Sequence, residues 1–113
     1  QPTADDVVRH IEHAVNVAGE EHVSIGTDGT LSTVALTPEF VQSFTANVAR
    51  RKAAGIAAPQ ESDDGYLFAN DLNTPRRFEQ LADRLSLRGH SDDRIEKILG
   101  ANLLRVFGAA WDS

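Results

Sequence analysis

Apolar residues recur every three or four positions along residues 3–18, which is the spacing of one face of an α-helix. Thr3 precedes Asp6 by three residues, as in a capping box, and Gly19 is a typical helix stop. The pattern therefore predicts an amphipathic helix whose two ends are encoded locally.

A second helical pattern covers residues 38–54, where Thr37 is a suitable N-cap and Pro38 fits the first helical position. The next residues, 56–73, contain Pro59 and many polar residues and show no helical period. They predict a long loop, and long ordered loops in small domains are often functional.

The remaining pattern predicts a set of closing helices over residues 75–111. Thr74 is expected to cap the first of them, ahead of Pro75. Asn102 comes after Gly100 and is expected to cap the last helix, which is a structural role.

One segment has a different pattern. Residues 22–27, HVSIGT, contain β-branched residues and predict a short strand that ends at Asp28 and Gly29. Asp-Gly is a common hairpin turn, so residues 22–36 could form a β-hairpin. Alternatively, the strand could end at Asp28 and present its carboxylate to an active site. The return segment alternates poorly and a helix begins at once after Thr37, which counts against the hairpin. The order of a helix, this segment, a loop and a second helix is that of an α/β barrel, in which catalytic groups lie at the ends of strands. Local sequence alone leaves both alternatives open.

The overall composition limits the function further. The net charge is −6, so a basic surface for nucleic acid is not expected. Cysteine is absent, which excludes disulfides, thiolate nucleophiles and cysteine-based zinc sites within this sequence. No apolar run reaches the length of a membrane span.

The four histidines give a weak metal signal. His10 and His13 lie three residues apart on one predicted helix, but no further ligand accompanies them. We expect His22 to hold a structural position at the start of the strand and His90 to make a local contact. The acidic stretch at residues 61–64 lacks the ligand spacing of a calcium loop and is expected to be solvated.

Two longer blocks carry a resemblance. They are HIEHAVNVAGEEHVSIGTDG, residues 10–29, and RGHSDDRIEKILGANLLRVF, residues 88–107. Both resemble the C-terminal part of the membrane (renal) dipeptidase family of zinc peptidases, whose pattern is a helix with H-[IL]-[DE]-H, a strand like DHVGIGSDFDG and a closing RGYSEEDIEKILGGNFLRVF. The blocks occur in the same order and together span nearly the whole chain.

The resemblance implies that residues 1–113 are the C-terminal part of a (β/α)8 TIM-like metallohydrolase barrel, with its last strand at about 22–27. It implies an enzyme with a binuclear zinc centre whose ligands lie upstream, so that none of the four histidines binds metal. It also implies that Asp28 is a catalytic aspartate that faces the metals and handles a proton. The substrate-binding residues stay unassigned.

The chain departs from the family form at one point, because TDGT stands where the family has SDFDG. The substrate is therefore expected to be a dipeptide or a related small amide. The expected partner is the remainder of the barrel, as another chain or a missing segment, and the complete enzyme is expected to be a homo-oligomer. The isolated segment should be inactive, and either the bacterial periplasm or the cytoplasm would suit the complete enzyme.

Two rival interpretations stay open at the level of sequence. One is a self-contained helical interaction domain with the hairpin at 22–36. The other is a scaffold that resembles the dipeptidases but has lost its metal ligands.

Overall fold

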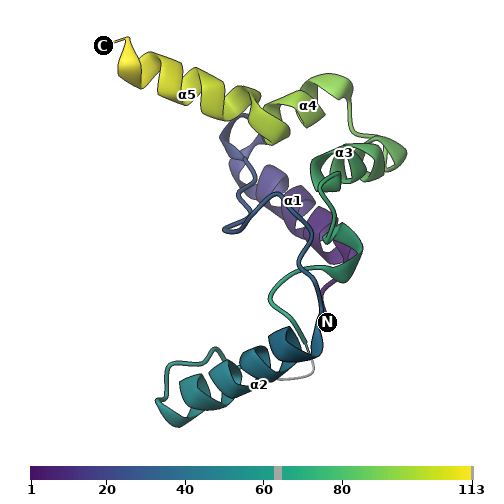
Figure 1. Cartoon of the computed structure of the whole chain (residues 1–113). Helices are drawn as coiled ribbons and strands as arrows, with labels where there is room; N and C mark the ends of the chain where they lie inside the picture. The colour runs from purple at the N-terminus through teal and green to yellow at the C-terminus, as the bar shows by residue number, and fades with distance from the viewer. Residues whose placement is uncertain (63–64, 113) are drawn as a thin grey trace.

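Helices joined by loops form the molecule in a computed structural model that describes residues 1–62 and 65–112 (Figure 1). The elements are α1 (Ala4–Ala18), η1 (Glu20–His22), α2 (Pro38–Ala53), η2 (Asn70–Leu72), α3 (Arg77–Leu87), α4 (Asp92–Glu96), η3 (Lys97–Ala101) and α5 (Asn102–Trp111). Of the short elements, η1 and η2 are 3₁₀ turns and η3 is a π-helical turn. In the described ranges we find no helix with both the length and the apolar character that crossing a membrane requires.

The predicted starts of the first two helices are confirmed. The Thr3 side chain accepts a hydrogen bond from the Asp6 amide, and the Asp6 carboxylate accepts one from the Thr3 amide. At the start of α2, the Thr37 hydroxyl oxygen accepts from the Phe40 amide at 3.1 Å, and Pro38 is the first helical residue. These ends were predictable because each cap involves residues three apart.

The closing helices differ in detail from the prediction. Helix α3 begins at Arg77 rather than at Pro75, and Thr74 is not its cap. Asn102 is also not a cap, because the chain runs through η3 into α5 without a side-chain cap at the junction. Of the predicted loop 56–73, residues 63–64 lie outside the described residues, and Asn70–Leu72 form η2.

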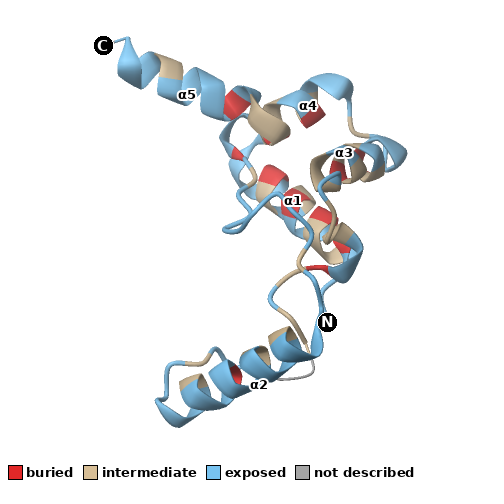
Figure 2. Ribbon diagram, in the orientation of Figure 1, coloured by how far each residue is buried: buried red, intermediate tan, exposed pale blue. Residues whose placement is uncertain are grey.

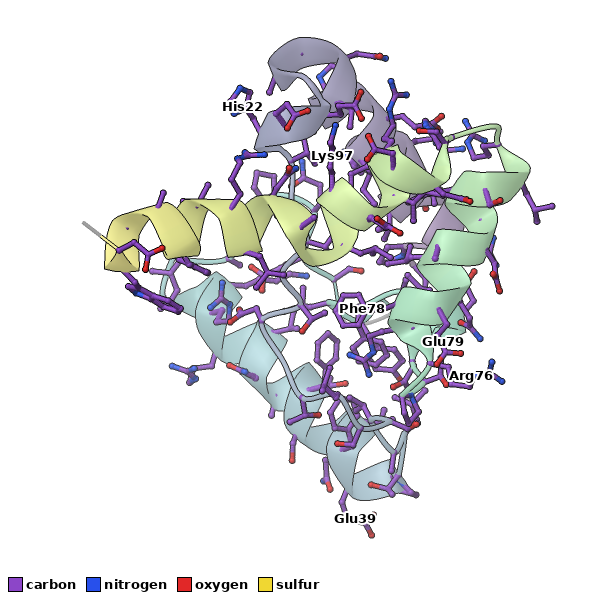
Figure 3. All side chains as sticks on the ribbon, turned by 90° about the horizontal axis from the view of Figure 1, so that it is seen from above. His22, Glu39, Arg76, Phe78, Glu79 and Lys97 are labelled. Carbon is purple, nitrogen blue, oxygen red and sulfur yellow. The ribbon has the colours of Figure 1, made fainter. Side chains whose placement is uncertain are left out.

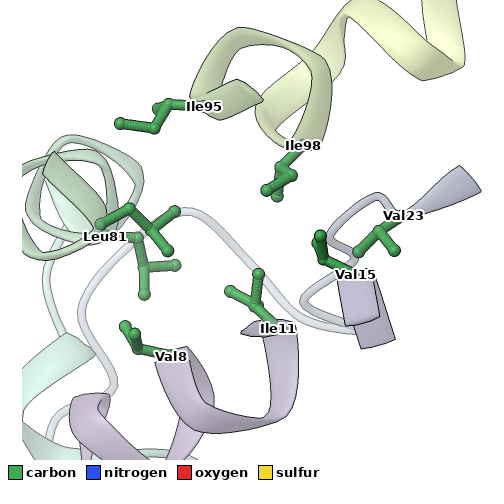
Figure 4. Packing of buried hydrophobic residues seen from close by; sticks show 8 residues of the cluster. Val8, Ile11, Val15, Val23, Leu81, Ile95 and Ile98 are labelled. Atoms are coloured by element: carbon green, nitrogen blue, oxygen red, sulfur yellow. The ribbon is translucent and has the colours of Figure 1, made fainter. Parts of the chain in front are cut away.

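A small apolar core joins α1 to α3 and to the α4–η3 segment. Figure 4 shows side chains from these elements meeting, with Val23 at one edge. The buried cluster consists of Val8, Ile11, Val15, Val23, Leu81, Leu85, Ile95 and Ile98. Figure 2 shows buried positions gathered where these elements meet, whereas most of α2 and α5 is exposed.

The predicted α/β fold with a barrel strand at 22–27 is wrong. The described residues include no β-strand, and Glu20–His22 form a 3₁₀ turn. Val23 does have extended dihedral angles, with φ −113° and ψ 132°. A strand, however, needs a neighbour to satisfy its backbone groups, and no described segment supplies one. The described residues therefore form a mainly helical structure that does not fit a segment of a (β/α)8 barrel.

The alternative hairpin at 22–36 is absent as well. A two-residue type I′ turn would need positive φ at both Asp28 and Gly29. Asp28 has φ +50°, but Gly29 is not among the glycines with positive φ. The backbone after Asp28 instead makes hydrogen bonds with side chains near the start of α3.

The molecule is extended rather than spherical. Helices α2 and α5 project in different directions from the pair formed by α1 and α3 (Figure 1). The radius of gyration is 16.8 Å, against roughly 13 Å for a compact chain of this length. Several large apolar side chains are accordingly exposed, most of all Leu87, Trp111 and Leu104.

Candidate functional site

Asp28 lies at the end of the extended segment and at the start of an irregular loop. It is exposed, and its φ of +50° is the one left-handed value among non-glycine residues of the described chain. Aspartate tolerates this region better than most residues, yet the conformation still has to be held by its surroundings.

A cavity of about 420 Å³ opens beside Asp28. Its walls come from the segment around Asp28, from α1, from the start of α2, from the residues that lead to η2 and from α3. The apolar lining consists of Val7, Ile25, Val34, Phe40, Leu67, Phe68, Ala69, Leu72 and Leu81. The polar lining comprises Thr27, Asp28, Thr30, Asn73 and Arg77. A small, mostly apolar hollow with a few polar groups on one side is the usual form of a small-molecule site.

Aromatic rings form one side of this hollow. The Phe44 and Tyr66 ring centroids are 5.1 Å apart, and Tyr66 stacks on Phe68 at 5.5 Å. Phe40 lies 5.9 Å from Tyr66 and lines the cavity together with Phe68. This contact attaches α2 to the loop at 65–68 and gives the cavity an aromatic wall.

Two side chains near the start of α3 hold the loop after Asp28. Arg77 donates to the carbonyl oxygens of Thr30 and Ser32, both at 2.9 Å. The Asn73 amide group binds Val34 twice: its oxygen accepts from the Val34 amide at 2.7 Å, and its nitrogen donates to the Val34 carbonyl at 2.8 Å. The loop is therefore fixed by side chains that lie about forty residues away in sequence.

The two sequence blocks that carry the family resemblance lie against each other. Asn102, which is 3% exposed, donates to the carbonyl oxygens of Glu20 at 2.7 Å and Val23 at 2.9 Å. Arg105 donates to the Glu21 carboxylate at 2.9 Å and also to its backbone carbonyl. The second block therefore positions the extended segment that leads to Asp28.

Charged side chains strengthen the contact between the blocks. Lys97 forms an ion pair with Glu21 at 2.7 Å, and a hydrogen bond from Lys97 lowers the pKa of the Glu21 carboxyl below its ordinary value. Near the start of each block, Arg88 forms an ion pair with Glu12, and the His90 imidazole lies 3.0 Å from the same carboxylate. The hydrogen bond from Arg88 is the main reason that the pKa of Glu12 is lowered.

The histidines do not form a metal site within the described residues. His10 and His13 are exposed. His90 contacts Arg94 four residues on, as a local contact, and also the distant Glu12. His13 and His22 line a second, more open hollow of about 410 Å³, with apolar neighbours. Residues 1–62 and 65–112 contain no cluster of three or more possible metal ligands. The zinc ligands that the resemblance implies were expected upstream of these residues, so the described residues do not test that expectation.

Sequence reasoning singled out Asp28 but missed Asn73 and Arg77. Asn73 is the last residue of the predicted loop 56–73, and Arg77 falls at the start of the predicted closing helices. The neighbouring sequence does not distinguish Arg77 from Arg76. Only the folded structure shows that Arg77 reaches the loop at 30–32. Their role depends on long-range contacts, which single-sequence patterns do not encode.

No protein-family model matches the chain, and no solved structure matches it.

Proposed function

We propose that this chain is the C-terminal part of a metal-dependent, dipeptidase-like hydrolase that cleaves the amide bond of a dipeptide or a related small amide. Asp28 is its catalytic residue. The proposal rests on the resemblance of the two sequence blocks and on the position of Asp28 at the cavity, and it requires no particular fold for the rest of the enzyme.

The observation that carries the proposal is the exposed Asp28 carboxylate beside a cavity of about 420 Å³. This volume lies in the range of about 300–1,000 Å³ that is usual for small-molecule sites. It suits a dipeptide side chain better than a folded protein substrate. The apolar and aromatic walls would bind that side chain, while the carboxylate lies at the polar side.

The chemistry assigned to Asp28 is proton transfer during hydrolysis. Water adds to the amide carbonyl carbon, so a new C–O bond forms. The Asp28 carboxylate takes a proton from the attacking water and gives it to the leaving nitrogen as the C–N bond breaks. The products are a carboxylic acid and an amine, and Asp28 is regenerated. A positioned general acid–base group of this kind typically contributes about 10²–10⁴-fold to the rate.

The contact between the two blocks is consistent with this role. Asn102 and Arg105 hold η1 and Val23, and that segment leads directly to Asp28. The zinc ions of the complete enzyme would be bound by residues outside this chain, and no step assigned to Asp28 depends on their geometry.

The proposal is tested by assaying the full-length protein, supplied with zinc, against a panel of unblocked dipeptides. Release of the two free amino acids is measured by amine detection. Longer peptides serve as controls of substrate size, and N-acetylated dipeptides serve as controls for the free amino group. We expect cleavage of free dipeptides or small amides and little cleavage of long peptides. Absence of hydrolysis across the panel would instead favour a dipeptidase-like scaffold without catalytic activity.

A further inference from the structure

We propose that Arg77 and Asn73 are positioning residues, which fix the loop at residues 28–34 and thereby hold the Asp28 carboxylate at the cavity. This inference rests on the proposed function, because it assigns the two side chains a role in the reaction through Asp28. It names a part of the site that the family resemblance does not supply.

Arg77 contacts the middle of the loop with both terminal nitrogens of its guanidinium group. One donates to the Thr30 carbonyl at 2.9 Å, and the other donates to the Ser32 carbonyl at 2.9 Å and to Leu31 at 3.5 Å. Its Nε donates to the Thr74 carbonyl at 2.9 Å, which fixes the side chain against its own backbone. The planar group thus reaches three successive carbonyl oxygens, a geometry that a lysine ammonium cannot reproduce.

Asn73 fixes the far end of the same loop. Its amide makes a paired contact with the backbone N–H and C=O of Val34, at 2.7 and 2.8 Å. This is the pairing that an adjacent strand would otherwise provide. The loop has no regular secondary structure of its own, so these side chains replace a backbone ladder.

The location of these contacts connects them to Asp28. Arg77, Asn73, Thr30 and Asp28 all line the same cavity. The first loop carbonyl that Arg77 holds belongs to Thr30, two residues after Asp28. Because Asp28 has a left-handed backbone, its conformation depends on how the next residues of the loop are held. Release of the loop would therefore move the carboxylate away from the substrate.

The neighbouring arginine provides a matched control. Arg76 pairs with Glu79 at 2.7 Å on the outer side of α3, whereas Phe78 lies on the side that faces the rest of the molecule (Figure 3). Arg76 and Arg77 are adjacent and identical in type, but only Arg77 lines the cavity. Replacing either one removes the same charge from the start of the same helix.

The experiment compares Arg77→Gln, Asn73→Ala and the control Arg76→Gln in the full-length protein. We expect Arg77→Gln and Asn73→Ala to lower kcat by about 10–100-fold, since small misplacements of a catalytic group have effects of this size. KM should change much less than kcat, and amide hydrogen exchange should become faster at residues 28–34. Arg76→Gln should leave both readouts at wild-type values. Two variants that release the loop at different points, its middle and its far end, keep the test informative if one of them folds poorly.

A double-mutant comparison shows whether Arg77 acts through Asp28. If it does, Arg77→Gln should have little further effect on kcat in an Asp28→Asn background. An equal fold-loss in both backgrounds would overturn the positioning role. Wild-type kcat and loop exchange in both Arg77→Gln and Asn73→Ala would overturn it too.

The proposed function and the positioning role fail in different ways. If the wild-type protein hydrolyses no substrate, the proposed function and the catalytic assignment fail together, while exchange at residues 28–34 still shows whether the two side chains hold the loop. If the wild-type protein is active but Arg77→Gln behaves like Arg76→Gln, only the positioning role fails.

Discussion

Asn102 connects helix α5 to two backbone carbonyl groups of the segment before Asp28. Its amide nitrogen donates to the Glu20 and Val23 carbonyls, and its oxygen accepts from Arg105 at 3.0 Å. The sequence indicated a structural asparagine, which was right in kind, but the expected role as a helix cap was wrong. A cap can be predicted from three adjacent positions, whereas these partners lie about eighty residues away.

We predict that Asn102→Ala destabilises the protein by about 1–3 kcal/mol, because it removes the donor to the buried Val23 carbonyl and to the part-buried Glu20 carbonyl. Asn47→Ala is the matched control, since Asn47 is exposed and accepts a local hydrogen bond from Arg50. The stability of both variants is measured as the midpoint of urea unfolding. Equal midpoints for the two would contradict the bridging role of Asn102.

At the scale of elements, helix α1 is joined to the segment before α4 by polar contacts as well as by the core. Glu12 on α1 meets Arg88 and His90, and His90 in turn lies 3.2 Å from Arg94. The first two helices were predictable from local capping and apolar period, as Thr3 and Thr37 show. The mutual arrangement of the helices was not, because the pairing of Glu12 with residues 88–94 depends on tertiary packing.

The lowered pKa of Glu12 predicts a loss of stability in acid. The folded-state pKa lies below the ordinary value of 4.5, because Arg88 stabilises the charged form. The contribution is therefore fully present above about pH 4.5 and is lost as the pH falls through the folded-state pKa. We expect the thermal midpoint to fall in this range more steeply for the wild type than for Glu12→Gln. Parallel pH profiles for the two proteins would show that this pair does not contribute.

At the scale of the whole molecule, the extended shape explains which predictions failed. The segment at 22–27 was expected to be a strand because of its β-branched residues, but a strand forms only where another strand satisfies its backbone. Helix α5 likewise keeps an apolar face exposed, with Leu104 at 76% and Trp111 at 79%. The conformation that a segment prefers can be predicted from its sequence. Whether another segment is present to pair with its backbone or to cover its apolar face cannot.

The central claim is that Asp28 performs proton transfer in the full-length enzyme. The Asp28→Asn variant is a clean probe, since asparagine tolerates the left-handed backbone and keeps the size of the side chain. Asp83→Asn, which changes an exposed aspartate of α3 that does not line the cavity, is the control.

The most direct measurement is the kcat of Asp28→Asn for a dipeptide that the wild type cleaves, with bound zinc quantified in the same samples. We expect kcat to fall by about 10²–10⁴-fold while zinc content and the activity of Asp83→Asn stay at wild-type levels. A wild-type kcat in Asp28→Asn would contradict the catalytic role of Asp28.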